Sequence, residues 1–390
     1  MNKINNWQLK KLGEVCKITY GKGLSTKELK ESGFPVFGAN GIIGFNDKYL
    51  YKESQVLISC RGAYSGKINF SPPLCYVTNN SLILEILNEE EINKKFLFHV
   101  LHTVNKTKLV TGTAQPQVTI NNAVELTFTI PNLETQQAIV SKIEELFSEL
   151  DKGIEDLKTA QQQLKTYRQS VLKWAFEGKL TNENVKDGEL PKGWTLSTIE
   201  KVANKITDGE HFRPPTQSDG IAFLSAKDVR DNGVSFDAPL YISEETAKKA
   251  LQRCNPQLGD ILIVSRGATV GRMCIVNTSR QFCLLGSVIL IKVNENINNL
   301  FLNYVLKSPI ANQKMITVSG ATAQQAIYLR DIKKIEIPLP PLAEQHQIIQ
   351  EIESRLSVAD KMEESIAHSL LQAESLRQSI LKKAFSGELV

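Results

Sequence analysis

RQSVLKWAFEGKL, residues 168–180, and RQSILKKAFSGEL, residues 377–389, decide the fold of this chain. The two stretches are identical at nine of thirteen positions when one is shifted by 209 residues. The match continues upstream at the same shift in three pairs: Ile139 and Ile348, Ile143 and Ile352, Asp151 and Asp360. Similarity at a fixed period over this length indicates an internal duplication. The chain therefore carries two copies of one element.

Apolar residues in both copies recur in alternating steps of four and three, which is the spacing of a coiled-coil seam. The first seam is Ile143, Phe147, Leu150, Ile154, Leu157, Gln161, Leu164, Arg168, Val171 and Ala175. The second seam is Ile352, Leu356, Ala359, Glu363, Ile366, Leu370, Ala373, Arg377, Ile380 and Ala384. Each helix would be roughly 65 Å long at 1.5 Å per residue. A single globular segment between them leaves one helix end and returns to it, so we expect the helices to pair antiparallel.

Two arginines and two phenylalanines interrupt or end these seams. Arg168 and Arg377 either pair with an acid across the helix pair or with a bound partner, or the helices diverge and leave both exposed. Phe176 and Phe385 either cover the base of a neighbouring globular domain or present a docking surface. The residues expected to pack the helices or dock another subunit are Phe147, Leu150, Leu157, Arg168, Phe176, Leu356, Ile366, Leu370, Arg377 and Phe385.

The composition, 42% hydrophobic and 23% charged over 390 residues, is that of a soluble protein with two or three domains. No run of 18 apolar residues and no apolar signal core is present, so we expect a cytoplasmic protein without a membrane span. The six cysteines form no C-x-x-C pair and are expected to be small core hydrophobes rather than metal ligands or disulfides.

Charge divides by region. Residues 1–132 and 191–341 each carry a formal charge of +5, whereas residues 133–190 and 342–390 each carry −3. Basic globular segments suit contact with a polyanion, and acidic helices do not. This asymmetry favours nucleic acid as the partner of the globular segments.

The second globular segment repeats the first more loosely. Trp194 matches Trp7 at a shift of 187, whereas Arg266-Gly267-Ala268 matches Arg61-Gly62-Ala63 at a shift of 205. The change in shift predicts an insertion in the second copy between about residues 228 and 259. In the first copy we expect strands at 56–59, 80–86 and 125–130, a tight turn at 62–67 and a helix at 90–104.

These patterns predict an α+β protein. Two mixed α/β domains, residues 1–132 and 194–341, would be related by a pseudo-twofold axis and separated by two long antiparallel coiled-coil helices. The helical segments are residues 133–180 and 342–390, and residues 181–193 form a linker. Paired helices are stiff, so they would act as a ruler between two domains.

Two short motifs carry a family resemblance. Pro341, Leu342, Glu344, Gln345 and Ile348 form P-L-x-E-Q-x-x-I at the start of the second helix, and Ala384, Phe385, Gly387 and Leu389 form A-F-x-G-x-L at its end. With the duplicated basic domain and its Arg-Gly-Ala turn, the whole chain resembles the specificity subunit of a Type I restriction-modification system. The first copy departs from the pattern, with Asn132 and Thr135 in place of Pro341 and Glu344.

The resemblance implies that each globular domain is a target recognition domain reading one half of a split, asymmetric site in double-stranded DNA. It implies that the helices are a spacer that helps to dock two modification (methyltransferase) subunits and, through them, restriction (translocase-nuclease) subunits. S-adenosylmethionine, ATP and Mg would bind those partners, so this chain would hold no cofactor and no metal. The expected chemistry of the complex is adenine methylation and restriction of unmodified DNA.

Arg and Lys suit guanine and Asn and Gln suit adenine, so candidate contacts are such residues in glycine-bounded or polar loops. The candidates are Lys22, Asn40, Asn46, Arg61, Tyr64, Lys67, Gln115, Gln117, His211, Arg213, Lys227, Arg266, Arg272, Gln324 and Gln325. Arg61 and Arg266, matched in both copies, are as well explained by structure or phosphate contact. The turn at residues 208–211, followed by Pro214 and Pro215, resembles a loop of target recognition domains, although Asp-Gly turn chemistry explains it equally well.

Catalytic motifs are not found in the sequence. Ser71-Pro72-Pro73-Leu74 has leucine where the S-P-P-aromatic loop of amino-methyltransferases has its stacking ring, and no nucleotide-binding glycine loop accompanies it. His99 and His102, three residues apart, lack a third metal ligand. We therefore expect a non-catalytic subunit. The alternative is a coiled-coil adaptor whose basic domains bind RNA or protein, and salt-dependent binding of duplex DNA would discriminate the two.

Overall fold

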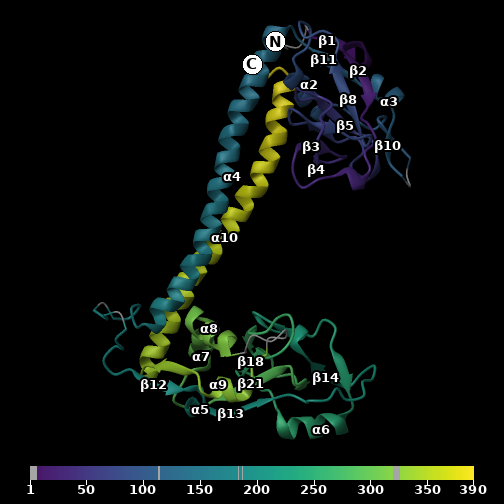
Figure 1. Ribbon diagram of the computed structural model, residues 1–390. Coiled ribbons are helices and arrows are strands. Elements are labelled where there is room, and N and C mark those ends of the chain that lie inside the picture. The colour runs from purple at the N-terminus through teal and green to yellow at the C-terminus, as the bar shows by residue number, and fades with distance from the viewer. Residues whose placement is uncertain (1–6, 113–114, 183, 187, 319–325) are drawn as a thin grey trace. The chain divides into compact units, whose positions relative to one another are not determined.

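The structure is a computed structural model that describes residues 7–112, 115–182, 184–186, 188–318 and 326–390 (Figure 1). The chain divides into two compact units: unit 1 is Met1–Lys158 with Ala367–Val390, and unit 2 is Thr159–Ile366. Each unit contains one globular head, residues 7–132 (head 1) or 194–341 (head 2), and about half of each long helix. Every helix in the described ranges is too short or too polar to cross a membrane.

Head 1 is built on a four-stranded sheet of order β2-β8-β5-β6 and a three-stranded sheet of order β4-β3-β7, with β1-β11 and β10-β9 as two-stranded pairs. Its elements are β1 (Gln8–Lys11), α1 (Leu12–Val15), β2 (Cys16–Tyr20), η2 (Thr26–Glu28), β3 (Phe34–Phe37), β4 (Ile42–Asn46), β5 (Val56–Ser59), η3 (Gly62–Tyr64), β6 (Ile68–Phe70), β7 (Tyr76–Val77), β8 (Ser81–Ile86), α2 (Lys94–Thr103), β9 (Val110–Thr111), β10 (Gln117–Val118), α3 (Ile120–Val124) and β11 (Thr127–Ile130). The strand β5 is buried along its whole length, so it forms the centre of the head.

The predicted strands at 56–59, 80–86 and 125–130 and the turn at 62–67 are confirmed within two residues at each end. The predicted helix at 90–104 is shorter, because it begins only at Lys94. Asn93 caps it: the side chain accepts hydrogen bonds from the amides of Lys95 and Phe96. An asparagine in this role satisfies amides that have no partner inside the helix, so residues 90–93 stay outside it.

Head 2 has the same plan, with sheets of order β13-β21-β18-β19 and β17-β14-β20 and the pair β12-β22. Its elements are β12 (Thr195–Thr198), α5 (Ile199–Val202), β13 (Ala203–Asp208), β14 (Ile221–Leu224), η4 (Ala226–Asp228), β15 (Val229–Arg230), β16 (Gly233–Val234), β17 (Leu240–Ile242), α6 (Glu244–Arg253), β18 (Ile261–Val264), β19 (Met273–Ile275), β20 (Phe282–Leu284), β21 (Val288–Val293), α7 (Asn299–Lys307), α8 (Pro309–Val318), α9 (Leu329–Lys333) and β22 (Glu336–Leu339). The elements β15, β16 and α6 have no counterpart between β3 and β5 of head 1, which confirms the predicted insertion.

The two long helices are α4 (Leu133–Phe176) and α10 (Leu342–Phe385), each 44 residues long. The predicted helical segments extend to residues 180 and 390, but both helices end earlier, and the next turn contains Gly178 (φ 77°) or Gly387 (φ 76°). A residue in the left-handed region ends a helix, and glycine adopts it without strain.

The predicted seams are confirmed. Every seam side chain is buried or half-buried, and Ile143, Val171, Ile352, Ala359 and Ala384 are fully buried. The helix α4 begins in unit 1 and ends in unit 2, whereas α10 begins in unit 2 and ends in unit 1. Within each unit the two helices therefore run antiparallel, as Figure 1 shows.

Both seam arginines pair with acids of the other helix. In unit 2, the Arg168 guanidinium lies 2.6 Å from the Asp360 carboxylate and 3.0 Å from that of Glu363. In unit 1, Arg377 pairs with Asp151, and its guanidinium carbon lies 4.5 Å from the centre of the Phe147 ring. Of the two alternatives left open by the sequence, pairing across the helices is confirmed.

A buried glutamine ties the first turn of each long helix to its head. The Gln136 side chain accepts a hydrogen bond from the Asn93 amide (2.9 Å) and donates to the carbonyl oxygens of Glu91 and Pro131 (2.9 Å each). The corresponding bonds of Gln345 join it to Asn298 (2.7 Å), Asn296 (3.1 Å) and Pro340 (2.9 Å). Both side chains are fully buried. Fully satisfied buried amides of this kind fix the angle between helix and head.

The phenylalanine that ends each long helix packs on a head. Phe385 of α10 meets Phe96 of α2 in unit 1, with ring centres 5.4 Å apart. Phe176 of α4 meets Phe301 of α7 in unit 2, at 5.5 Å. Both contacts are edge-to-face, the arrangement that aromatic rings favour. These residues cover the base of a globular head, which was the first of the two alternatives from the sequence.

The remaining predicted helix residues also lie in the packed seams. Leu150 and Leu157 of α4 and Leu370 of α10 are half-buried in unit 1. Leu356 and Ile366 of α10 are half-buried in unit 2, where Leu356 packs on the core of head 2. The six cysteines are buried thiols without disulfides, as expected for small hydrophobes.

Candidate nucleic-acid interface

Three loops of head 1 are fastened together at the end of β5. The Ser81 hydroxyl donates to the carbonyl of Gly38 (2.8 Å), which holds the loop after β3. The Ser65 hydroxyl and the Gly62 amide both donate to the carbonyl of Pro116 (2.7 and 3.2 Å), which joins the turn containing η3 to the β9-β10 hairpin. Hydrogen bonds of this kind pre-position polar side chains on the surface.

These loops bring together five of the predicted contact residues: Asn40, Arg61, Tyr64, Lys67 and Gln117. The Lys67 ammonium donates to the side-chain oxygen of Asn40 (2.5 Å) and lies 5.7 Å from the centre of the Tyr64 ring, which is 50% exposed. Arg61 is exposed, and its backbone pairs with that of Gln117. Exposed amide, ammonium and guanidinium groups in one place suit contacts with phosphates and base edges.

Lys22 and Gln115 are exposed, and the backbone of Lys22 forms a parallel bridge with Thr78. Asn46 is different, because both polar atoms of its side chain have backbone partners. It donates to the carbonyl of Glu28 (3.1 Å) and accepts from the amide of Lys48 (3.0 Å). These bonds favour a structural role for Asn46.

In head 2, a side chain of α6 holds the turn after β13. The Asp208 carboxylate is buried and lies 2.5 Å from the guanidinium of Arg253, which also donates to His211 Nε2. Arg253 is in the last turn of α6, inside the insertion. It was not among the predicted residues, and the only signal in the sequence was its position in the inserted segment.

The other predicted residues of head 2 are less uniform. Arg213 and Arg266 are exposed, and Arg272 is half-buried. Lys227 is exposed, but its ammonium contacts the Asp228 carboxylate (2.6 Å) and donates to the carbonyl of Ala238 (2.7 Å), so it braces its own loop. Gln324 and Gln325 lie outside the described residues.

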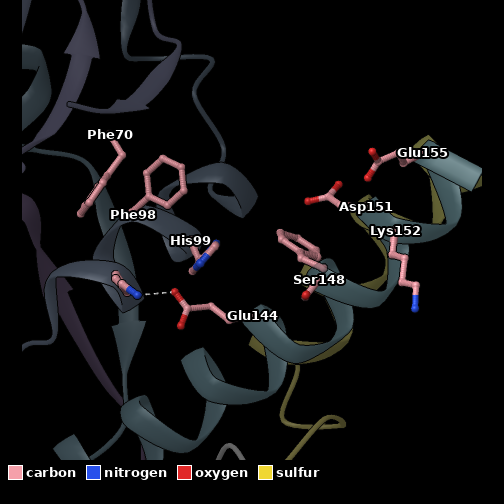
Figure 2. Close-up of a pocket in the computed structure, with 10 residues that line it drawn as sticks. Phe70, Phe98, His99, Glu144, Ser148, Asp151, Lys152 and Glu155 are labelled. Atoms are coloured by element: carbon pink, nitrogen blue, oxygen red, sulfur yellow. Dashed lines mark hydrogen bonds and ion pairs between the residues drawn. The ribbon is translucent and has the colours of Figure 1, made fainter. Parts of the chain in front are cut away.

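A separate pocket of about 670 Å³ lies between head 1 and α4 in unit 1 (Figure 2). Its apolar lining is Phe70, Phe98, His99 and Phe147, and its polar lining is Lys95, Glu144, Ser148, Asp151, Lys152 and Glu155. Burial lowers the pKa of His99 to about 4, so this imidazole is neutral near pH 7. An apolar floor beneath an exposed charged helix face is suited to a protein partner.

In the described ranges, no three His, Cys, Asp or Glu side chains gather in an arrangement that would hold a metal ion. The buried histidine His99 lies against Phe98 and Phe147, with ring centres 5.1 and 5.9 Å away. His99 is therefore part of the core of head 1.

The fold and the loop surfaces describe a protein with two similar heads on one pair of helices. The profile of the family described as "Type I restriction modification DNA specificity domain" matches residues 4–159 and 191–368. The chain therefore belongs to this family and contains the domain twice.

Relatives agree with this assignment. The chain is 26% identical to the Type I restriction enzyme EcoBI specificity subunit of Escherichia coli, over 99% of this chain and 86% of that protein. It is 25% identical to the putative type I restriction enzyme MjaX specificity subunit of Methanocaldococcus jannaschii, over 98% and 94%. The alternative of a coiled-coil adaptor has no support from these matches.

Solved structures share the fold. A chain from work on complex assembly and conformational transition of the type I R-M system superposes with a TM-score of 0.72 at 22% identity, covering 98% of each chain. The crystal structure of the HsdS subunit from Thermoanaerobacter tengcongensis superposes with a TM-score of 0.61 at 21% identity, covering 98% of this chain and 97% of that one. Both extend over heads and helices, so the predicted α+β architecture is confirmed.

Proposed function

We propose that this chain is the DNA-recognition subunit of a Type I restriction-modification complex and reads an asymmetric, bipartite site in double-stranded DNA, one head per half-site. The observation that carries the proposal is that two heads with one strand order present different side chains at corresponding places. Lys22 and Glu210 both follow a glycine at the end of the first sheet strand and form equivalent parallel bridges, with Thr78 and Leu285. Opposite charges at one structural position suit two different half-sites.

The accessible candidates divide by chemistry. Arg61 and Arg266 occupy matched turns in both heads, which favours contact with phosphate, the part of DNA that every site shares. Lys67 corresponds to Arg272 at the same shift of 205, so it belongs with these matched cations. Asn40 and Gln117 in head 1 are better placed to discriminate bases. Ala326 takes the place of Gln117 in head 2, because Arg61 and Arg266 form equivalent backbone bridges with these two residues. Side chains of the first kind set the position of a head on the duplex, and those of the second kind choose its sequence.

The helices support a second part of the proposal, the docking of two modification subunits of one kind. Four exposed residues of α4 are identical to their counterparts 209 residues later in α10: Glu144 and Glu353, Ser148 and Ser357, Lys152 and Lys361, Glu155 and Glu364. Their spacing of four, four and three residues puts them on one face of the helix. We call this set the repeated face.

The repeated face does not follow from packing within the chain. In unit 1, Glu144 accepts a hydrogen bond from Lys95 (2.5 Å), but the counterpart of Lys95 at a shift of 205 is Leu300. Exposed neighbours such as Glu145 and Glu149 become Ser354 and Val358 in the second copy. The four residues of the repeated face are identical in both copies, although exposed residues beside them have changed. A partner that binds both copies explains this identity.

The remaining chemistry belongs to the partners. Modification subunits would bind S-adenosylmethionine and methylate adenine, and restriction subunits would use ATP and Mg to translocate and cut DNA. This chain contributes no reacting group and acts by holding a half-site where a partner reaches it. Positioning alone contributes greatly to rate, because it replaces an encounter with a fixed geometry.

The experiment is to express the complex in a host and to sequence its methylated DNA before and after replacing residues 8–132 with the first domain of another family member. The expected result is a split adenine-methylated motif of which one half changes and the other half stays. The matched control replaces residues 195–341 and should change only the other half. A motif unaltered by either exchange would contradict the assignment of one head to one half-site.

A further inference from the structure

Phe212 has 88% of its side chain exposed, more than any other large apolar side chain in the described part of the chain. It lies in the loop between β13 and β14 of head 2. Burial of a phenylalanine side chain contributes about 1.5–3 kcal/mol to stability, so an exposed one contributes little to folding. The position of this ring needs another explanation.

The loop that carries Phe212 is braced at its base. A side chain at Gly209 would place its Cβ 2.0 Å from the carbonyl oxygen of Leu284, so the backbone there lies directly against β20. The Glu210 amide donates to that same carbonyl (2.8 Å), and the Glu210 carbonyl accepts from the amide of Gly286 (2.7 Å). These bonds hold the base of the loop, and the ring projects beyond it.

The neighbouring residues restrict the loop further. His211, the residue before Phe212, contacts both Arg253 (2.5 Å) and Asp208 (3.5 Å), and that carboxylate is buried. Pro214 and Pro215 lie two and three residues after Phe212, and the fixed φ of proline limits how far the backbone can fold back. An apolar ring held away from the core on both sides is prepared for contact with another molecule.

The charge around the ring identifies the class of that molecule. Arg213 follows Phe212, is exposed and forms no ion pair with any residue in the described ranges. Arg266, in the neighbouring turn after β18, is exposed as well. An aromatic ring beside two exposed arginines fits a duplex, whose phosphates attract the guanidinium groups and whose bases offer apolar edges.

We infer that Phe212 is a specificity-determining residue for the half-site of head 2, through an apolar contact between its ring and a base of the duplex. This inference rests on the proposed function. Head 1 lacks the feature: its Gly21 lies equally close to a strand, 2.2 Å from Cβ to the Thr78 oxygen, and three residues later stands Leu24, which is half-buried. Phe212 therefore makes the two heads different in what they read.

The test uses the chain assembled with its modification subunits and a synthetic duplex carrying the motif found by methylome sequencing. Affinity is measured at one fixed salt concentration for this duplex and for single base-pair variants across both half-sites. We expect Phe212→Ala to weaken binding of the cognate duplex roughly ten-fold, the usual order for the loss of one base contact. Discrimination should be lost at one base pair of the half-site of head 2 and kept throughout the half-site of head 1.

Leu258 provides the matched control. It is 65% exposed in the turn that precedes β18, whereas Arg266 and its turn follow that strand. Leu258→Ala should leave affinity and discrimination unchanged, and Phe212→Trp should restore most of what Phe212→Ala loses. Because Phe212 is exposed, thermal unfolding of Phe212→Ala should match that of the parent complex.

Three results would overturn the inference. Full discrimination by Phe212→Ala would show that the ring reads no base. An equal loss of affinity for cognate and unrelated duplexes would show that the ring contacts only the DNA backbone. If the parent complex fails to distinguish any duplex from another, the proposed function itself fails and the inference fails with it. The parent complex is measured first, so this last case is recognised separately.

Discussion

The two units of this protein agree where heads join helices and differ where loops face outward. Gln136 and Gln345 make the same three bonds, and Phe385 and Phe176 make the same ring contact. In contrast, Lys22 of head 1 corresponds to Glu210 of head 2, and only head 2 has α6. Contacts that the fold requires have been kept in both copies, whereas positions without such a requirement have diverged.

The two seam arginines show the same combination of one kept contact and one changed contact. Arg168 and Arg377 are equivalent, and each pairs with an equivalent aspartate. The second partner differs: Arg377 lies over Phe147, whereas Arg168 reaches Glu363. A seam arginine with an acid across the helices fixes their register, and the second contact is free to vary.

The largest expected effect on the two units comes from replacing the buried glutamines. Gln136→Leu and Gln345→Leu each leave one buried amide and two buried carbonyls without a partner, so each should lower the free energy of unfolding of its unit by about 3 kcal/mol. Urea unfolding, followed by hydrogen exchange of peptides from α2 and α7, measures the two units separately. Gln137→Leu, at the exposed neighbouring position, should change stability by less than about 0.5 kcal/mol. Clearly unequal losses would show that the two junctions are not equivalent.

A smaller effect is a difference between the two units in how their stability depends on pH. Burial lowers the pKa of His99 in unit 1 to about 4, from an ordinary value of 6.5, and the unfolded chain therefore binds more protons between these values. The contribution of His99 to stability is lost as pH falls from 6.5 toward 4, by about 2 kcal/mol between pH 7 and pH 5. Burial also lowers the pKa of His102, which adds in the same direction.

Unit 2 supplies the comparison for this effect, because the counterpart of His99 at a shift of 205 is Tyr304, which does not titrate in this range. Hydrogen exchange at pH 7 and pH 5 should show unit 1 losing more protection than unit 2. His99→Tyr should remove the larger part of that loss. Equal acid sensitivity of the two units would count against a neutral buried histidine.

The smallest effect concerns the repeated face. Lys152→Glu and Lys361→Glu each reverse one exposed charge, so each should weaken binding of a modification subunit by about five-fold, equivalent to about 1 kcal/mol. The two losses should be equal, and titration calorimetry with the purified subunit measures them. Lys158→Glu is the control, since this exposed lysine has Ala367 as its counterpart. If Lys158→Glu weakens binding as much, the loss of affinity comes from the overall charge of the helix and not from the repeated face.

Much of the candidate interface was predictable, because arginine, asparagine and glutamine beside glycines mark polar loops. Three such residues of head 1, Asn40, Arg61 and Gln117, do meet in one place, together with Tyr64 and Lys67. Asn46 and Lys227 were also predicted as contact residues. In the structure, their side chains form hydrogen bonds with backbone carbonyls or amides of their own heads. Arg253 and Phe212 were missed, because the importance of both depends on contacts or exposure in the folded head.

The sequence by itself determined the duplication, the two seams, the antiparallel pairing of the helices and the insertion in the second copy. All of these follow from the periodicity of apolar residues and from the order of segments, and both can be read along the chain. Only the tertiary structure decided which loop residues remain accessible, which acids the seam arginines meet and how Gln136 and Gln345 join helix to head. Those outcomes depend on hydrogen bonds between residues far apart in the chain, and local patterns carry no record of them.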